Sequence, residues 1–344
     1  MNPWAFIMMI SSLILGTLIT LTGYHWMLTW AGLEINTLAI MPLMMKKPHP
    51  RAIEAATKYF LTQAAASALI LFSATTNAWM TGEWAINTTM DNTSSILITI
   101  ALAMKLGVAP FHLWLPEVLQ GLTLQTGLIL LTWQKLAPMT LMIQLSQSVN
   151  LNLMLIMGLL STILGGWGGI NQTQIRKMLA FSSTAHLGWM MTILKIYPQL
   201  TMLNFIVYTF ITSTLLYMFM YLKTKNISEV STSWSKNPVL SSFSLLSILS
   251  LGGLPPFTGF SPKWLIIQEL VNQGLTFFSL IIMLSTLLSL FFYLRLIYAM
   301  SITLSPNTTN SVTTWLNPTK TWTAAPIIFT LTLLPILPTY ISIM

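Results

Sequence analysis

Long apolar stretches recur along the chain, and short polar or turn-forming segments separate them. A helix that crosses a bilayer needs about 20 mostly apolar residues. Read against that length, the pattern predicts eleven membrane-spanning helices. The predicted spans are residues 3–22, 25–44, 52–79, 95–118, 123–145, 149–170, 175–195, 200–222, 239–268, 275–300 and 324–343.

The connections between these spans are short and rich in Gly, Pro and Asn. None is long enough to hold a separate soluble domain, so residues 1–344 are expected to form one transmembrane domain. The first span lacks the basic start and the small-residue cleavage site of a secretory signal. We therefore expect it to be retained in the mature protein.

Composition agrees with a membrane protein. Only 6% of the residues are charged and 54% are hydrophobic, whereas an ordinary soluble domain carries about 25% charged residues. This balance excludes a soluble enzyme, a disordered protein and a secreted disulfide scaffold. The chain has 0 Cys, which excludes disulfides, thiolate catalysis, iron–sulfur ligation and Cys-type zinc sites. The predicted class is an all-α polytopic membrane protein.

The basic residues predict the orientation. With eleven spans, eleven loop or helix-end Lys and Arg lie on the side of the N-terminus, and the opposite side has Lys195 beside three acidic residues. Short loops on the inner side of a membrane are enriched in Lys and Arg. The N-terminus is therefore expected inside. The same rule accounts for the net charge of +8, so we expect no nucleic-acid partner.

Four charges lie within the predicted spans: Glu34, Lys105, Lys135 and Lys263. The first three are ten to twelve residues into their helices, which places them about 15–18 Å deep. A charge at the centre of a bilayer costs about 2.5–3.5 kcal/mol on insertion scales. One acid cannot neutralise three lysines. A lysine held between apolar surroundings and a carboxylate can exchange a proton near neutral pH, so we predict a proton relay. The alternative is a buried Lys–Glu pair that only specifies packing.

Two histidines also fall within spans. His186 is a candidate relay group, and His112 is a secondary one, because imidazole titrates near physiological pH. A single membrane histidine can instead serve as an interhelical hydrogen-bonding partner. His25 and His49 lie at helix ends and are expected at the membrane interface.

Two spans carry the same helix-breaking motif, G-x-x-P-F followed by Pro, at an offset of 146 residues. Pro removes a backbone donor and clashes with the preceding turn, and free carbonyls at membrane depth occur only where they line protein or water. Each motif lies beside a lysine within a span. The motif residues are Gly107, Pro110, Phe111 and Pro116, then Gly253, Pro256, Phe257 and Pro262, with Pro255 before Pro256.

Paired interrupted helices at corresponding positions are typical of transporters built from inverted repeats. The predicted topology agrees, because the first broken span runs from outside to inside and the second from inside to outside. The expected repeats cover about residues 3–145 and 149–300, and the helix at 324–343 follows them.

These motifs, and the stretches around them, resemble the antiporter-like proton-pumping subunits of mitochondrial respiratory complex I, the NADH:ubiquinone oxidoreductase. The resemblance extends over the whole chain and points to a vertebrate, specifically a mammalian, protein. The stretches that carry it are HWMLTWAGLEINTLAIMP, EAATKYFLTQAAAS, MKLGVAPFHLWLPEV, LLTWQKLAP, GGWGGINQTQIRKMLAFSSTAHLGWM and LSLGGLPPFTGFSPKW.

The resemblance implies a fold of two inverted five-helix repeats, each with a broken helix. Bacterial relatives have fourteen helices, so this chain is expected to lack three at its N-terminus. By motif, Glu34 and Lys105 would be the ion pair of the first repeat, Lys135 the central lysine, and Lys263 the lysine of the second broken helix.

The resemblance also implies a setting. The chain would be a multi-pass protein of the mitochondrial inner membrane, with its N-terminus on the matrix side. Its partners would be other membrane-arm subunits of complex I, including neighbouring antiporter-like and accessory subunits, and phospholipids such as cardiolipin. We expect no metal and no cofactor in this chain. Flavin and iron–sulfur clusters would lie in other subunits, which would perform the redox catalysis.

The predicted function is proton translocation through a relay of Glu34, Lys105, Lys135, Lys263 and His186, coupled to NADH oxidation and ubiquinone reduction elsewhere in the complex. Two alternatives remain open on the sequence. The chain could be a stand-alone cation/proton antiporter, or a scaffold subunit that does not pump.

Overall fold

The computed structural model describes residues 3–46, 49–86 and 90–303, and these ranges are helical apart from turns and two isolated bridges. The span predicted at 324–343 lies outside them. The helices are α1 (Pro3–Thr22), α2 (Trp26–Met44), α3 (Pro50–Thr81), α4 (Asn92–Leu106), α5 (Trp114–Gly121), α6 (Leu124–Leu131), α7 (Trp133–Gln144), α8 (Leu151–Ile170), α9 (Ile175–Ile193), α10 (Pro198–Leu222), α11 (Ile227–Ser231), α12 (Ser233–Lys236), α13 (Pro238–Gly252), α14 (Phe260–Asn272) and α15 (Thr276–Ser301).

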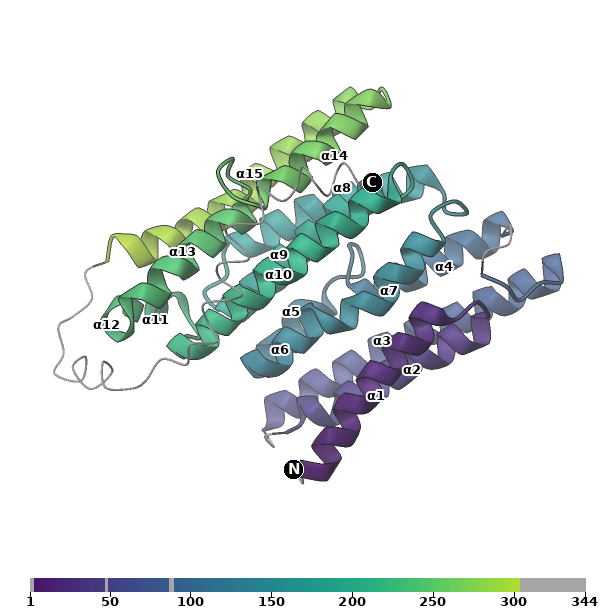
Figure 1. Ribbon diagram of the computed structural model, residues 1–344, viewed down its shortest axis with the longest axis horizontal. Coiled ribbons are helices and arrows are strands. Elements are labelled where there is room, and N and C mark those ends of the chain that lie inside the picture. The colour runs from purple at the N-terminus through teal and green to yellow at the C-terminus, as the bar shows by residue number, and fades with distance from the viewer. Residues whose placement is uncertain (1–2, 47–48, 87–89, 304–344) are drawn as a thin grey trace.

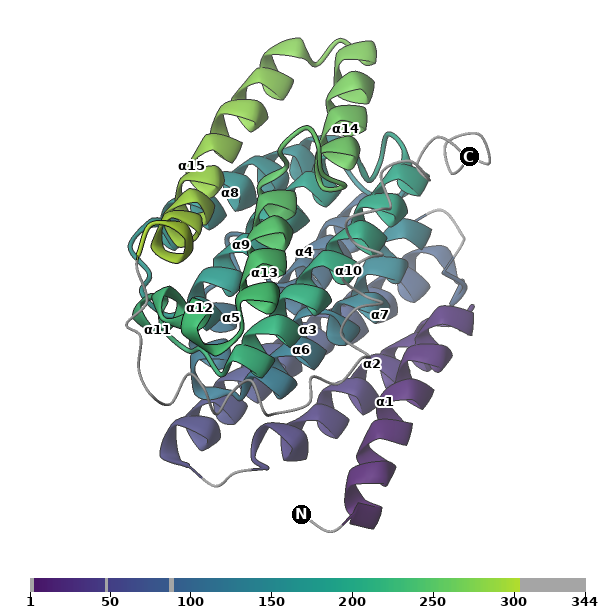
Figure 2. The ribbon, with the colours of Figure 1, turned by 60° about the vertical axis from the view of Figure 1, so that its left-hand side comes forward.

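The long helices lie side by side as an elongated bundle (Figure 1). Helices α1–α3 form one end, α13–α15 form the other, and α4–α10 lie between them, as the turned view in Figure 2 also shows. Within the described ranges, six helices are long and apolar enough to cross a membrane: α1, α2, α3, α8, α10 and α15. The fold is therefore that of an all-helical membrane protein.

The helices coincide with the predicted spans, with three differences. The spans at 95–118 and 239–268 are each divided, as the motifs predict, into α4 and α5 and into α13 and α14. The span at 123–145 is also divided, into α6 and α7 with Thr132 between them. The sequence pattern does not predict this division. The Thr132 hydroxyl donates to the Leu128 carbonyl (2.7 Å), and such back-bonding bends helices. The third difference is the pair of short helices α11 and α12 in the connection after α10.

Glycines allow two pairs of helices to approach closely. In α1 and α2, a Cβ on Gly16 would lie 2.9 Å from the Gly32 carbonyl oxygen, and a Cβ on Gly32 would lie 2.9 Å from the Gly16 oxygen. Gly158 of α8 and Gly188 of α9 face each other in the same way, at 3.1 and 2.8 Å. Small residues at membrane helix crossings permit this backbone contact. These glycines therefore fix the crossings that hold α2 and α9 in place.

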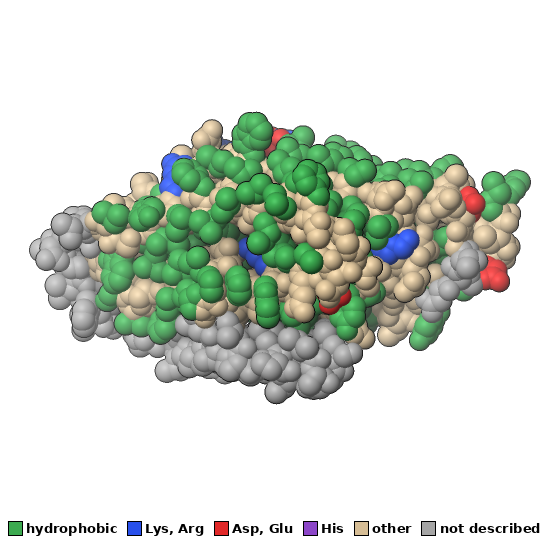
Figure 3. All heavy atoms as spheres, turned by 90° about the horizontal axis from the view of Figure 1, so that it is seen from above, with side chains coloured by type: hydrophobic (Ala, Val, Ile, Leu, Met, Phe, Trp, Pro, Cys, Tyr) green, Lys and Arg blue, Asp and Glu red, His purple; other side chains and the backbone are tan. Residues whose placement is uncertain are grey.

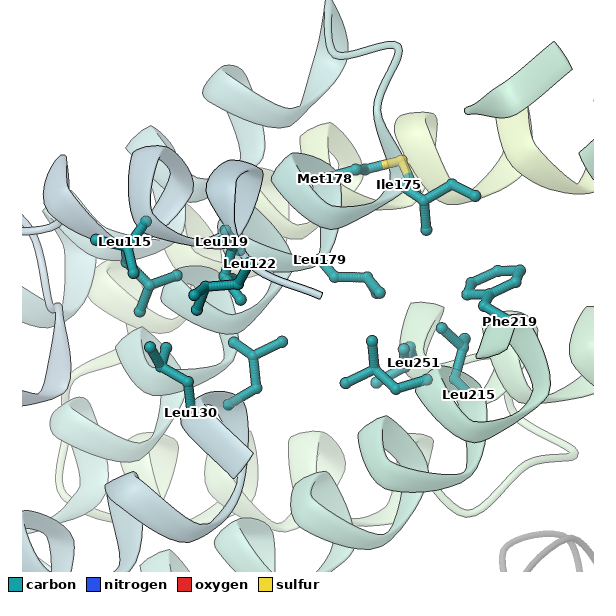
Figure 4. Packing of buried hydrophobic residues seen from close by; sticks show 14 of the residues in the cluster. Leu115, Leu119, Leu122, Leu130, Ile175, Met178, Leu179, Leu215, Phe219 and Leu251 are labelled. Carbon is teal, nitrogen blue, oxygen red and sulfur yellow. The ribbon is translucent and has the colours of Figure 1, made fainter. Parts of the chain in front are cut away.

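Buried apolar side chains fill the space between the two halves of the chain. Leu119 of α5, Leu130 of α6, Leu179 of α9 and Leu251 of α13 belong to one cluster of buried hydrophobic residues. Figure 4 shows these side chains converging from helices that are far apart in the sequence. The cluster packs the second part of the first broken helix against the second half of the bundle, so the two halves form one body.

The outer surface is apolar, and its basic side chains lie near helix ends. On the face shown in Figure 3, hydrophobic side chains dominate and charged ones are few. The Arg295 guanidinium donates to the Ile170 carbonyl at the end of α8 (2.9 Å), and Lys195 donates to the Val149 carbonyl (2.6 Å). Cations are favourable beside the terminal carbonyls of helices, as at Ile170, whereas Val149 lies in the turn before α8. The arrangement suits a bundle surrounded by hydrocarbon with polar ends.

The same backbone bridge occurs twice. His25, before α2, pairs with Ala85, after α3, and Gln174, before α9, pairs with Asn226, after α10. Two N–H···O bonds of 3.0–3.1 Å make each bridge. The donors and acceptors are Trp26 to Trp84 and Ile86 to Tyr24 in the first bridge, and Ile175 to Lys225 and Ile227 to Thr173 in the second. The start of α2 is thus tied to the end of α3, and the start of α9 to the end of α10.

Candidate functional site

The two broken helices end and restart at matching residues. Helix α4 ends at Leu106 and α13 at Gly252, while α5 begins at Trp114 and α14 at Phe260, so the offset of 146 holds on both sides of the break. Gly107 and Gly253 terminate the first segments with φ of 77° and 80°, a left-handed conformation that glycine adopts without strain. The hydrogen bonds also match, since Phe111 bonds back to the carbonyl of Val108 and Phe257 to that of Leu254.

Glu34 and Lys105 lie at the start of a line of polar groups inside the bundle. Lys105 is 6% exposed on the last turn of α4, and its ammonium interacts electrostatically with the Glu34 carboxylate of α2. The two do not form a direct ion pair. Among the described residues, the ion pairs are those of Lys58 with Glu54 and with Glu117. Among the described residues, one Glu34 oxygen and the Lys105 nitrogen are buried without a hydrogen-bond partner.

Lys105 and Lys135 line the same small cavity, whose walls are otherwise mostly apolar. Its volume is about 20 Å³, and both lysines line it together with Asn36 and Gln63. The Asn36 side-chain oxygen and the Gln63 side-chain nitrogen are buried and have no partner among the described residues. A cavity of about 10–15 Å³ by this measure holds a water molecule when polar groups surround it. The cavity is therefore large enough to hold a water molecule, and both lysines are among the residues around it.

Lys135 lies in α7 at the centre of the line and is 3% exposed. Its ammonium donates to the hydroxyl of Tyr208 in α10 (3.2 Å) and lies 5.0 Å from the centre of that ring. The Tyr208 ring is 5.4 Å from the ring of His186 in α9. Three helices thus bring a lysine, a phenol and an imidazole together, although their positions are far apart in the chain.

Lys263 lies at the second break and completes the line. Its ammonium donates to the Gly252 carbonyl (3.1 Å) and is 3.5 Å from the Leu251 carbonyl oxygen. These carbonyls end α13, where the partial negative charge of a helix favours a cation. His186 interacts electrostatically with both Lys263 and Lys135, so the imidazole is near both lysines. We call Glu34, Lys105, Lys135, Tyr208, His186 and Lys263 the polar axis.

The absence of a side chain at Gly253 leaves room for the Lys263 ammonium. A Cβ at Gly253 would lie 2.8 Å from the Lys263 nitrogen, so Gly253→Ala must displace the ammonium from the carbonyls of α13. Hydrogen bonds to charged groups contribute about 1.5–3 kcal/mol, so we expect proton pumping by the assembled complex to fall about tenfold.

Gly107→Ala is the matched control for Gly253→Ala. It introduces the same backbone strain, but its Cβ would meet Leu115 and Trp114 instead of a lysine. Pumping per assembled complex should therefore fall further in Gly253→Ala than in Gly107→Ala. Equal losses in both variants, measured in proteoliposomes, would show that Gly253 acts through the backbone alone.

Several predicted residues lie outside the polar axis. His112 is 6% exposed at the first break and packs edge-on against Phe181, and no described contact joins it to the lysines. Pro110, Pro255 and Pro256 lie in the two breaks. His25 and His49 accept hydrogen bonds at the starts of α2 and α3.

Sequence reasoning missed three members of the site. Tyr208, Asn36 and Gln63 are uncharged, and buried polar residues of their kinds are frequent in this chain. The one available signal was proximity in sequence, since Asn36 follows Glu34 by two positions. Tyr208 and Gln63 had no such signal. For metals, the described part of the chain contains no group of three or more His, Cys, Asp or Glu side chains.

Known proteins share both sequence and fold with this chain. Residues 23–289 match the family model described as NADH:quinone oxidoreductase/Mrp antiporter, TM, and residues 290–341 match that of the NADH dehydrogenase subunit 2 C-terminus. NADH-ubiquinone oxidoreductase chain 2 of Aquarana catesbeiana is 57% identical over 98% of this chain and 99% of its own length. The Xenopus laevis protein of the same name is 57% identical over 93% of both chains.

The fold is also found in solved structures. A chain of respiratory complex I from Thermus thermophilus with bound aureothin superposes with a TM-score of 0.85 at 23% identity, over 97% of this chain and 78% of that one. A chain of the Mrp complex from Dietzia sp. gives a TM-score of 0.77 at 16% identity, over 87% and 61%. The relatives named above are amphibian, and the mammalian source stays a prediction. By sequence and by fold, the chain belongs to the antiporter-like membrane family of NADH:quinone oxidoreductases and Mrp antiporters, and within it to the NADH-ubiquinone oxidoreductase chain 2 proteins.

Proposed function

We propose that this chain is a proton-translocating membrane subunit of NADH-ubiquinone oxidoreductase, and that the polar axis is its proton path. The observation that carries the proposal is the set of ionisable and hydroxyl groups inside an apolar bundle, with Lys135 bonded to Tyr208 and Tyr208 packed against His186. Such groups are costly at membrane depth, and they mark proton relays in pumps and transporters. Membership of a family named for oxidoreductases and antiporters supports the same function.

The mechanism is a succession of electrostatic shifts. A displacement of Glu34 changes the field at Lys105, with which it interacts, and so changes how tightly Lys105 holds its proton. Water in the cavity then connects Lys105 to Lys135. From Lys135 the proton passes toward His186 and Lys263, which releases it to the outer side or signals to the next subunit. A change of about 1.4 kcal/mol alters a proton equilibrium tenfold, so moving one charge is enough to drive each transfer.

The proposal includes two inverted five-helix repeats, at about 3–145 and 149–300, and eleven spans in all. The matching breaks and the two equivalent backbone bridges support the repeats. In the predicted topology the first bridge lies outside and the second inside, as inversion requires. The match to 78% of the longer Thermus chain is consistent with the loss of helices relative to bacterial relatives.

We propose the mitochondrial inner membrane as the location, with the N-terminus on the matrix side. The partners are the other membrane-arm subunits of the complex, and phospholipids such as cardiolipin fill its lipid-facing grooves. In this assignment, NADH oxidation and ubiquinone reduction occur in other subunits, which hold the flavin and the iron–sulfur clusters. The absence of Cys from the sequence supports that division.

Replacing Glu34 tests this function. Glu34→Gln keeps the shape of the side chain and removes the charge that interacts with Lys105. Couplings between sites are about 1–3 kcal/mol, or about 5–150-fold, so we expect proton pumping by the assembled complex to fall at least about fivefold. Glu83→Gln, at an exposed position after α3, is the control and should pump normally.

The same preparation distinguishes the alternatives. A stand-alone antiporter would purify as an active single chain in mild detergent, whereas a subunit purifies with its partners. A scaffold that does not pump predicts that Glu34→Gln leaves the ratio of protons pumped to electrons transferred unchanged. An unchanged ratio would contradict the proposed function.

A further inference from the structure

Tyr208 is the one member of the polar axis that the sequence pattern does not indicate. Its side chain is 1% exposed in the middle of α10. Its hydroxyl oxygen accepts a hydrogen bond from Lys135, at 3.2 Å. Among the described side chains, Tyr208 is the hydrogen-bond partner of the central lysine. This contact differs from a packing contact, because it aligns a proton of the lysine with an atom that can receive it.

The direction of this bond determines what the phenol can do next. Because the oxygen accepts from an ammonium, the O–H of Tyr208 must point away from Lys135. The hydroxyls of Ser183 and Thr212 are within hydrogen-bonding reach of the phenol, and the centre of the His186 ring is 5.4 Å from that of the Tyr208 ring. Ser183 donates its own proton to the Ala180 carbonyl (2.7 Å), so its oxygen is free to accept. Tyr208 can thus accept on one side and donate on the other.

We propose that Tyr208 is a proton-transfer residue between Lys135 and His186. The inference rests on the proposed function. In the step, one N–H proton of Lys135 moves to the Tyr208 oxygen while the Tyr208 O–H proton moves to a ring nitrogen of His186, directly or through the Ser183 hydroxyl. Lys135 becomes neutral and His186 becomes an imidazolium. Tyr208 ends with one proton, as it began, so the step needs no oxidant and forms no tyrosinate.

The charge of His186 also depends on the lysines near it. The imidazole interacts electrostatically with Lys263 and with Lys135. Two lysines that were both charged would repel an imidazolium near them. Loss of the proton from Lys135 removes that lysine's part of the repulsion as His186 gains charge. The phenol therefore links the central lysine to the second broken helix.

The opposing interpretation is that Tyr208 only packs against Lys135 through its ring, 5.0 Å from the ammonium. Tyr208→Phe separates the two interpretations, because it keeps the ring and removes the hydroxyl. General acid–base groups contribute about 10²–10⁴-fold to proton transfer. We expect the assembled complex with Tyr208→Phe to lose this chain's share of the protons pumped per electron, as Lys135→Met does. Tyr217→Phe, a partly buried tyrosine on the same helix, is the control and should pump normally.

Tyr208→His provides the independent variant. A histidine restores a group that can accept and donate a proton at this position, so pumping should rise at least about tenfold above that of Tyr208→Phe. All ratios are measured per assembled complex in proteoliposomes. Full pumping by Tyr208→Phe would overturn the inference. So would pumping by Tyr208→His that is no better than that of Lys135→Met. Full pumping by Lys135→Met would instead overturn the proposed function itself, so the two failures are distinguishable.

Discussion

Lys135→Met is expected to abolish proton translocation through this chain while the complex still assembles. Lys135 lines the water-sized cavity and donates to Tyr208, so on the proposed path a proton has to pass it. The methionine side chain is similar in length to lysine and packs well in an apolar bundle, but it cannot bind a proton. Removing a general acid–base group slows transfer about 10²–10⁴-fold. The ratio of protons pumped to electrons transferred should therefore fall by the whole share of this subunit.

Lys225→Met is the matched control. It makes the same substitution at an exposed lysine after α10, so it should leave the ratio unchanged. The ratio is measured in proteoliposomes, with proton uptake and NADH oxidation followed together. A Lys135→Met complex that assembles normally and pumps at the full ratio would contradict the proton path and favour a scaffold.

Gly188→Ala is expected to prevent assembly. The added Cβ would overlap the Ser161 hydroxyl and lie 2.7 Å from a Thr162 methyl and 2.8 Å from the Gly158 carbonyl oxygen. The Thr162 methyl and the Gly158 carbonyl oxygen are rigid parts of the facing helix, so α8 and α9 would have to separate. Overpacking of this kind costs about 1–3 kcal/mol and sometimes more. It would also displace His186, two residues away, from Tyr208. We expect the amount of assembled complex to fall at least about tenfold.

Gly127→Ala is the comparison for this change. It makes the same substitution within helix α6, where the new Cβ would meet only the flexible end of Leu119, at 3.2 Å. Alanine favours helix over glycine by about 1 kcal/mol, so this variant should assemble normally. The amounts are compared by native gel electrophoresis of solubilised membranes. Equal amounts for both variants would show that the α8–α9 crossing tolerates extra volume.

The sequence predicted the bundle well because its signals are local. A run of about 20 apolar residues is sufficient to indicate a spanning helix, and Gly with Pro at fixed spacing is sufficient to indicate a break. Both breaks begin and end at matching residues in the structure. The eleven-span count and the orientation stay predictions, since the last span lies outside the described residues. The sequence does not indicate the interruption at Thr132, because it depends on one hydrogen bond, from the Thr132 hydroxyl to a main-chain carbonyl.

The charged members of the site were predictable for an equally simple reason. A charge within an apolar run is improbable without a function, so Glu34, Lys105, Lys135 and Lys263 stand out in the sequence alone. Their contacts do not. The expected direct ion pair of Glu34 with Lys105 is an interaction at longer range in the structure.

Tyr208 shows the limit of sequence reasoning most clearly. It is 73 positions from Lys135, and tyrosine is an ordinary residue in a membrane helix. Only the packing of α10 against α7 and α9 places its hydroxyl beside the lysine. The same holds for the cavity, whose lining residues come from several helices. Which polar residues share a site depends on the tertiary structure.

The most direct test is a structure of the assembled complex at a resolution that shows ordered water. The claim is that Lys105, Lys135 and Lys263 belong to one proton path. It predicts water in the cavity within hydrogen-bonding distance of the Lys105 and Lys135 nitrogens, and an unbroken series of hydrogen bonds from Lys135 through Tyr208 and His186 to Lys263. A dry cavity, or an apolar gap between Lys135 and Lys263 that neither side chains nor water cross, would contradict it.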